Sequence, residues 1–93
     1  MSDAIRKSFK AQGRVQNIGF RWFVLETARG MKLTGWVRNS GPAVEGEAQG
    51  PAGNVAAFLM EIREGHPQAC VREFETGELP LKEENDFQIR SSW

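Results

Sequence analysis

The order in which two hydrophobic periods follow one another constrains the fold of this chain most strongly. Residues 8–15 alternate between apolar or small and polar side chains, which is typical of a half-buried strand. Phe20, Val24 and Ala28 then recur at helical spacing. Gly30 is the expected end of that helix. The sequence therefore predicts a strand that leads directly into a helix.

The rest of the chain completes a familiar order of elements. Residues 33–38 and 44–49 alternate on either side of a turn and predict a β-hairpin. Apolar residues at helical spacing in 55–62 predict a second helix. Residues 71–77 are strand-like, and residues 87–89 are expected to add a short pairing. The order βαββαβ predicts an α+β, ferredoxin-like sandwich, in which two helices cover one face of an antiparallel sheet.

Composition limits the classes of protein to consider. The 93 residues, 40% hydrophobic and 26% charged, fit one compact domain over residues 1–93. Twelve basic residues balance twelve acidic ones, which argues against a nucleic-acid partner. The single cysteine, Cys70, allows no intramolecular disulfide and no cysteine-rich metal site. Because no segment reads as a membrane span or a secretory signal, we expect a cytoplasmic monomer with no membrane partner.

The segment from Gln16 to Arg21 is the candidate anion site. It connects a strand to a helix, whose first backbone N–H groups lack intrahelical partners and attract anions. Asn17 and Gly19 tolerate left-handed backbone angles, which allows the loop to turn its amides inward. Arg21 adds a planar cation that matches phosphate oxygens. A tight connection with an exposed arginine explains the same residues without a function, so the loop alone leaves both interpretations open.

Asn39 is the second candidate. The first two predicted strands run in the same direction, because one helix returns the chain between them, so their C-terminal ends share one edge of the sandwich. Arg21 and Asn39 are therefore expected to converge. Considered alone, Asn39 is more typical of a turn residue at the mouth of a hairpin.

Other conspicuous residues have structural explanations. Trp22, Trp36 and Trp93 are expected to pack, with Trp36 partly exposed on the face opposite the helices. His66 lies in a predicted loop and is expected to be structural, and Cys70 is expected to be a buried, inert thiol. A solvated surface, and not a metal site, is expected for five acidic residues: Glu73, Glu75, Glu78, Glu83 and Glu84.

Two motifs resemble the signatures of the acylphosphatase family. Gly13–Arg21 is similar to the family pattern Gly-x-Val-Gln-Gly-Val-x-Phe-Arg. Gly35–Asn39 is similar to the second pattern of glycine, an aromatic, a small apolar residue, any residue, then asparagine. The resemblance extends to domain size, element order and the strand that contains Val44-Glu45-Gly46, so it covers essentially the whole chain.

The resemblance implies hydrolysis of a small acyl phosphate to a carboxylate and inorganic phosphate, with no metal and no cofactor. Arg21 would bind the phosphoryl group, the side-chain amide of Asn39 would position the attacking water, and the water's proton would pass to the substrate phosphate. Backbone amides of the loop would complete the phosphoryl site at five residues: Gln16, Asn17, Ile18, Gly19 and Phe20.

Two other functions remain open from the sequence. Asn17 replaces a family glycine, and the hairpin turn at residues 40–43 is unusual, which favours a catalytically weak member that serves as an anion-binding sensor. RNA-recognition modules share the element order, but their aromatic signature belongs on a central strand, whereas residues 19–23 fall on a loop and a helix. Turnover of a simple acyl phosphate distinguishes the enzyme from the sensor, and a salt-dependent gel shift with single-stranded RNA tests the RNA-binding alternative.

Overall fold

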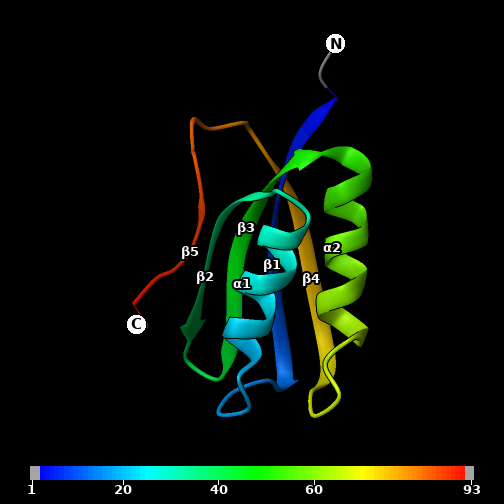
Figure 1. Ribbon diagram of the computed structural model, residues 1–93. Helices are drawn as coiled ribbons and strands as arrows, with labels where there is room; N and C mark the ends of the chain where they lie inside the picture. The colour runs from blue at the N-terminus through cyan, green and yellow to red at the C-terminus, as the bar shows by residue number, and fades with distance from the viewer. Residues whose placement is uncertain (1–2, 92–93) are drawn as a thin grey trace.

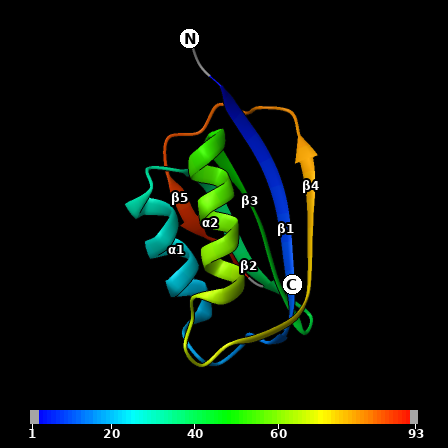
Figure 2. The same ribbon diagram turned by 90° about the vertical axis from the view of Figure 1, so that its right-hand side faces the viewer.

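The computed structural model describes residues 3–91, which form one five-stranded sheet and two helices (Figure 1). Both helices cover the same face of the sheet (Figure 2). Neither of these helices is long and apolar enough to cross a membrane. In chain order, the elements are β1 (Ala4–Arg14), α1 (Phe20–Gly30), β2 (Thr34–Ser40), β3 (Ala43–Pro51), α2 (Ala52–Glu64), β4 (Cys70–Leu79) and β5 (Phe87–Ile89).

The strand order β4-β1-β3-β2-β5 confirms the ferredoxin-like prediction, with one correction. Strands β4, β1, β3 and β2 pair antiparallel, but β5 pairs parallel with β2, with Phe87 opposite Gly35. The sheet is therefore mixed and not wholly antiparallel. Because β1 and β2 are both antiparallel to β3, they run in the same direction and end at the same end of the sandwich (Figure 1).

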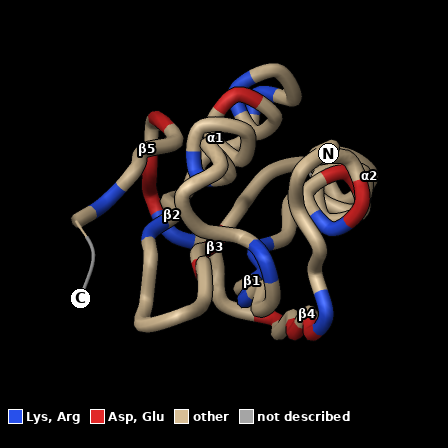
Figure 3. Tube along the Cα trace, turned by 90° about the horizontal axis from the view of Figure 1, so that it is seen from below, with Lys and Arg blue, Asp and Glu red and all other residues tan. Residues whose placement is uncertain are grey.

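The predicted apolar stripes meet between the helices and the sheet. Seen from the end where β1 and β2 finish, α1 lies over β2 and β5, and α2 lies over β1 and β4 (Figure 3). Phe58 of α2 packs edge-to-face with Phe9 at a centroid distance of 5.5 Å and with Phe87 at 6.0 Å. The helix stripe at Phe20, Val24 and Ala28 is buried as predicted.

A buried cation on the open face of the sheet was not predicted. Arg6 of β1 is fully buried and forms ion pairs with Glu47 at 2.8 Å and Glu84 at 2.7 Å. Burial lowers the pKa of Arg6, but its hydrogen bonds and charge interactions with the two glutamates outweigh burial, so the pKa lies above its usual value. Glu84 therefore holds the segment before β5 against the sheet, and the expected solvated acidic surface does not include it.

Two further expectations, for Trp36 and Cys70, need correction, and a third, for Trp93, concerns a residue outside the described range. Trp36 is buried although it lies on the open face, because the guanidinium groups of Arg38 and Arg90 lie 4.9 and 4.7 Å from the centroid of its ring. Cys70 is exposed and not buried, because it lies at the start of the edge strand β4. Trp93 lies outside the described residues.

His66 has the structural role that its sequence context indicates. Its ring packs at 6.0 Å from the ring of Phe20 and edge-to-face at 5.1 Å from that of Phe23. Its Nδ1 accepts a hydrogen bond of 3.1 Å from the backbone N–H of Gln68. His66 therefore supports the start of α1 from the side of α2.

Candidate active site

The loop between β1 and α1 has the backbone conformation that its sequence predicts. Asn17 has φ of 63° and Gly19 has φ of 76°, both left-handed. Gly19 is the N-cap of α1, no side chain of residues 3–91 caps this helix end, and the first turn contains no acidic residue. The first turn of α1 therefore keeps its positive potential, which favours a bound anion.

A cavity of about 150 Å³ lies at this end of α1. Four of the five predicted substrate-binding residues line this cavity. The exception is Ile18, whose side chain packs against the core. Its volume is several times the roughly 30 Å³ that a water molecule occupies in the liquid, so it can hold a group of several heavy atoms. The residues that line it are Val15, Gln16, Asn17, Gly19, Phe20, Arg21 and Trp22.

Arg21 supplies the cation of this cavity. It lies in the first turn of α1, and within residues 3–91 its side chain makes no ion pair and no hydrogen bond. An arginine without a carboxylate partner, beside the positive end of a helix, leaves a local excess of positive charge. A phosphoryl group would neutralise this excess.

Trp22 is the aromatic side chain that follows Arg21, and the expectation that it packs is wrong. It is 64% exposed, because it lies on the side of α1 that faces away from the core. Its indole nevertheless lines the cavity beside Arg21.

Gln16 contributes a contact that sequence analysis missed. Its side-chain Nε2 donates hydrogen bonds of 2.7 Å to the carbonyl oxygen of Gly41 and 3.0 Å to that of Ala43. Gly41, with a φ of 58°, and Pro42 form the two-residue β2–β3 turn, and Ala43 is the first residue of β3. The side chain of Gln16 thus ties the anion loop to the hairpin, a link between distant segments that no local pattern could indicate.

Asn39 lies close to this tie, near the end of β2, where its Cα pairs with that of Val44. Its Oδ1 is buried and has no hydrogen-bond partner within residues 3–91. Buried amide oxygens in proteins are nearly always paired with protein groups or water, so this atom is free to accept a bond from a water molecule. The end of β2, where Asn39 lies, and the start of α1 are at the same end of the sandwich, as the topology predicted (Figure 1).

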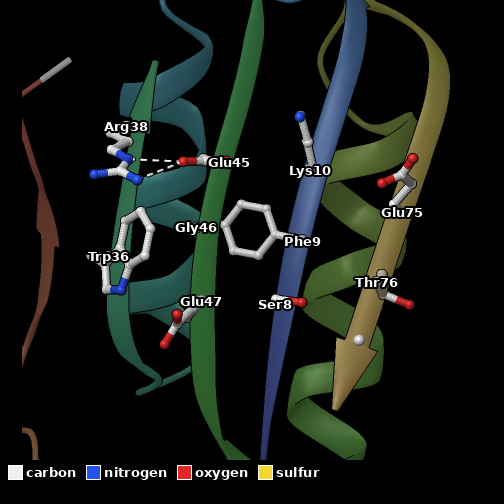
Figure 4. Close-up of a pocket in the computed structure, with 11 residues that line it drawn as sticks. Ser8, Phe9, Lys10, Trp36, Arg38, Glu45, Gly46, Glu47, Glu75 and Thr76 are labelled. Carbon is white, nitrogen blue, oxygen red and sulfur yellow. Dashed lines mark hydrogen bonds and ion pairs between the residues drawn. The ribbon is translucent and has the colours of Figure 1, made fainter. Parts of the chain in front are cut away.

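A separate groove of about 430 Å³ lies on the open face of the sheet, away from the helices (Figure 4). Trp36 forms one part of its wall, and Arg38 pairs there with Glu45 at 2.8 Å. Lys10 and Glu75 add one charge of each sign. Because this groove mixes both charges and lies on the other face of the sheet, it is a poor site for a phosphoryl group.

Comparison with known proteins agrees with the geometry. The acylphosphatase family model matches residues 7–89. An acylphosphatase from Moorella thermoacetica is 42% identical over 89 residues, which cover 95% of this chain and 96% of that protein. Acylphosphatase-1 from Gallus gallus is 39% identical over 87 residues, which cover 88% of each chain. An acylphosphatase structure from Coxiella burnetii superposes with a TM-score of 0.89 at 31% identity, covering 94% of this chain and 93% of that one. The chain belongs to the acylphosphatase family.

Proposed function

We propose that this acylphosphatase binds the phosphoryl group of its substrate in the cavity at the start of α1. The backbone amides of residues 16–20 and the guanidinium of Arg21 are the donors, and the side-chain amide of Asn39 positions the attacking water. One observation carries the proposal: an unpaired arginine and an uncapped helix start line the same cavity. Together they supply fixed positive charge where a phosphoryl dianion needs it.

The reaction needs no protein nucleophile. The oxygen of water attacks phosphorus while the bond between phosphorus and the acyl oxygen breaks, and the electron pair of that bond stays on the departing carboxylate. One proton of the water passes to a phosphoryl oxygen, so the products are a carboxylate and dihydrogen phosphate. Phosphoryl transfer to water is accelerated mainly by positioning and by neutralising charge on the equatorial oxygens, which the loop amides and Arg21 provide.

Asn39 has a different task from Arg21. Its Oδ1 can accept one hydrogen bond from the water and so orient a lone pair of the water towards phosphorus. An amide is too weak a base to remove the proton, which is consistent with proton transfer to the phosphate itself. Arg21 therefore acts on binding and on the transition state, whereas Asn39 acts on the water alone.

The test is hydrolysis of acetyl phosphate in the presence of a chelator, with inorganic phosphate as a competitive inhibitor. Arg21→Ala is expected to lower kcat/KM by about 1,000-fold or more and to weaken inhibition by phosphate. Asn39→Ala is expected to lower kcat by about 100-fold, the typical cost of one lost positioning group, with the inhibition constant of phosphate unchanged. Arg63→Ala, which removes an exposed arginine from α2, is the matched control and should keep full activity. If phosphate inhibits Arg21→Ala as strongly as it inhibits the wild type, the proposal is contradicted.

The structure gives no reason to favour a sensor over an enzyme. One of the two departures that motivated the sensor hypothesis, besides the hairpin turn at residues 40–43, is Asn17, which takes a left-handed φ of 63°. Asparagine is, after glycine, the residue that adopts this conformation most readily, so the loop keeps its shape without the family glycine.

We also infer that residues 1–93 form one domain that acts as a cytoplasmic monomer. One continuous hydrophobic core supports a single domain, and a single cysteine is consistent with a reducing compartment. A net charge of zero argues against nucleic-acid and membrane partners. A solution mass near 10.4 kDa by light scattering would support the monomer, and twice that mass would contradict it.

A further inference from the structure

A second cavity of about 570 Å³ adjoins the phosphoryl cavity. It lies between α1 and the segment around β5, and we call it the α1–β5 groove. Arg21 and Trp22 line both cavities, so the two spaces meet at these side chains. A substrate whose phosphoryl group contacts Arg21 can therefore extend its other end into the α1–β5 groove.

The groove follows one side of α1. Arg21, Leu25 and Arg29 lie four residues apart and present a continuous face towards β5. From the first to the last of them the helix rises about 12 Å, which is longer than a benzoyl group, so the groove can hold such a group along α1. Ile89 of β5 lines the opposite wall.

Trp22, Leu25 and Ile89 form an apolar stretch of the groove wall, Gln88 adds a polar side chain, and charges close the far end. Trp22 offers a largely exposed indole, and Leu25 and Ile89 add aliphatic surface. At the far end, Nη2 of Arg29 donates to Oδ2 of Asp86 at 3.2 Å and to the backbone oxygen of Phe87 at 3.0 Å. These charges satisfy one another, so the apolar stretch is the part available to a ligand.

From this arrangement we infer that the α1–β5 groove binds the acyl group and makes the enzyme prefer aromatic or other apolar acyl phosphates. The inference rests on the proposed phosphoryl site. An in-line displacement requires the water and the departing carboxylate on opposite sides of phosphorus. Asn39 does not line the groove, so an acyl group placed there leaves the amide of Asn39 free to hold the water.

Trp22 is the specificity-determining residue of this inference. A flat aromatic acyl group can pack against its indole, whereas an acetyl group is too small to cover it. Aromatic pairs contribute enough beyond simple burial to change an equilibrium by about 3- to 10-fold. Trp22→Ala is therefore expected to lower the ratio of kcat/KM for benzoyl phosphate to that for acetyl phosphate by about 3- to 10-fold. Trp22→Phe, which keeps an aromatic ring, should restore most of the ratio.

The experiment measures kcat/KM for both substrates in wild type, in the two Trp22 variants and in Met60→Ala. Met60 is the matched control, because it is an exposed apolar residue of similar exposure, 66% against 64%, but lies on α2. Inhibition by phenylphosphonate and by methylphosphonate gives a second readout without turnover. Trp22→Ala should weaken the phenyl inhibitor more than the methyl one.

The outcomes separate the two proposals. An unchanged substrate ratio in Trp22→Ala, or equal weakening of both phosphonates, overturns the acyl-group assignment while the phosphoryl site stands. A ratio that falls equally in Met60→Ala also overturns it, because the effect would then not be local to the groove. If Arg21→Ala leaves phosphate inhibition intact, the phosphoryl site itself fails, whatever the Trp22 variants do.

Discussion

Gln16→Ala should loosen both the phosphoryl loop and the hairpin that carries Asn39. In the native protein Nε2 of Gln16 donates to the carbonyl oxygens of Gly41 at 2.7 Å and Ala43 at 3.0 Å. No other side chain within residues 3–91 bonds to either carbonyl, so the loop and the turn lose their only side-chain tie. The substitution therefore tests whether the two halves of the site are held in register by this residue.

The structure sets the size of the effect on stability. The oxygen of Gly41 is exposed and will bond to water instead, at little cost, whereas the bond to Ala43 is partly buried. Losing a bond of the second kind and leaving its acceptor unpaired costs about 1–3 kcal/mol. For a domain of this size each kcal/mol lowers Tm by roughly 4–8 °C, so a loss of about 2 kcal/mol predicts a fall of roughly 8–16 °C.

The assay is thermal and urea unfolding followed by circular dichroism, together with acetyl phosphate kinetics at a temperature where the variant remains folded. Displacing catalytic groups by about 1 Å costs roughly 100-fold in rate, so kcat/KM should fall by about 10- to 100-fold. Gln12→Ala is the control: it removes the same side chain from β1, where that side chain makes no hydrogen bond within residues 3–91. If Gln16→Ala unfolds at the same urea concentration as Gln12→Ala and keeps wild-type kcat/KM, the reasoning about the tie is refuted.

Two predictions concern stability at other positions. Arg6→Met leaves Glu47 and Glu84 facing each other without their shared cation, and should cost about 3 kcal/mol in urea unfolding. Arg29→Met should cost less than about 1 kcal/mol, because both side chains of the Arg29–Asp86 pair are 53% exposed. Equal losses of stability in Arg6→Met and Arg29→Met would contradict this prediction. Asn17→Gly should change stability by less than about 0.5 kcal/mol, because relief of the left-handed φ offsets the greater entropy of unfolded glycine. Asn17→Ala should instead lower the free energy of unfolding by about 1 kcal/mol. If Asn17→Ala loses less stability than Asn17→Gly, this prediction is wrong.

Features encoded within a few neighbouring residues could be predicted from the sequence. The strand and helix periods are local, and they located the strands and helices that form the core. The left-handed conformations at Asn17 and Gly19 also follow from residue type alone, because few other residues adopt them without strain. The backbone shape of the loop that we propose to bind the phosphoryl group therefore follows from the sequence.

Features that depend on contacts between distant segments could not be predicted. Arg6 occupies a polar position in an ordinary alternation, and only the return of the segment that contains Glu84 buries it. Trp36 lies on the open face as expected, but Arg38 of the same strand and Arg90, which follows β5, cover it. The direction of β5 depends on how the chain crosses after β4, a choice that its three residues do not reveal.

The topology explains why the site lies where it does. A helix that returns the chain between β1 and β2 forces both strands to end at the same edge, so the start of α1 and the end of β2 are neighbours in any chain with this element order. Proximity alone does not fix the geometry of the site, because the helix that carries Arg21 and the strand that carries Asn39 could still move relative to each other. The side chain of Gln16 removes this freedom, because it bonds the loop on one side of the site to the turn on the other. The proposed phosphoryl site and the proposed water-positioning amide can then act as one rigid unit, and rigidity of this kind is what a reaction accelerated by positioning requires.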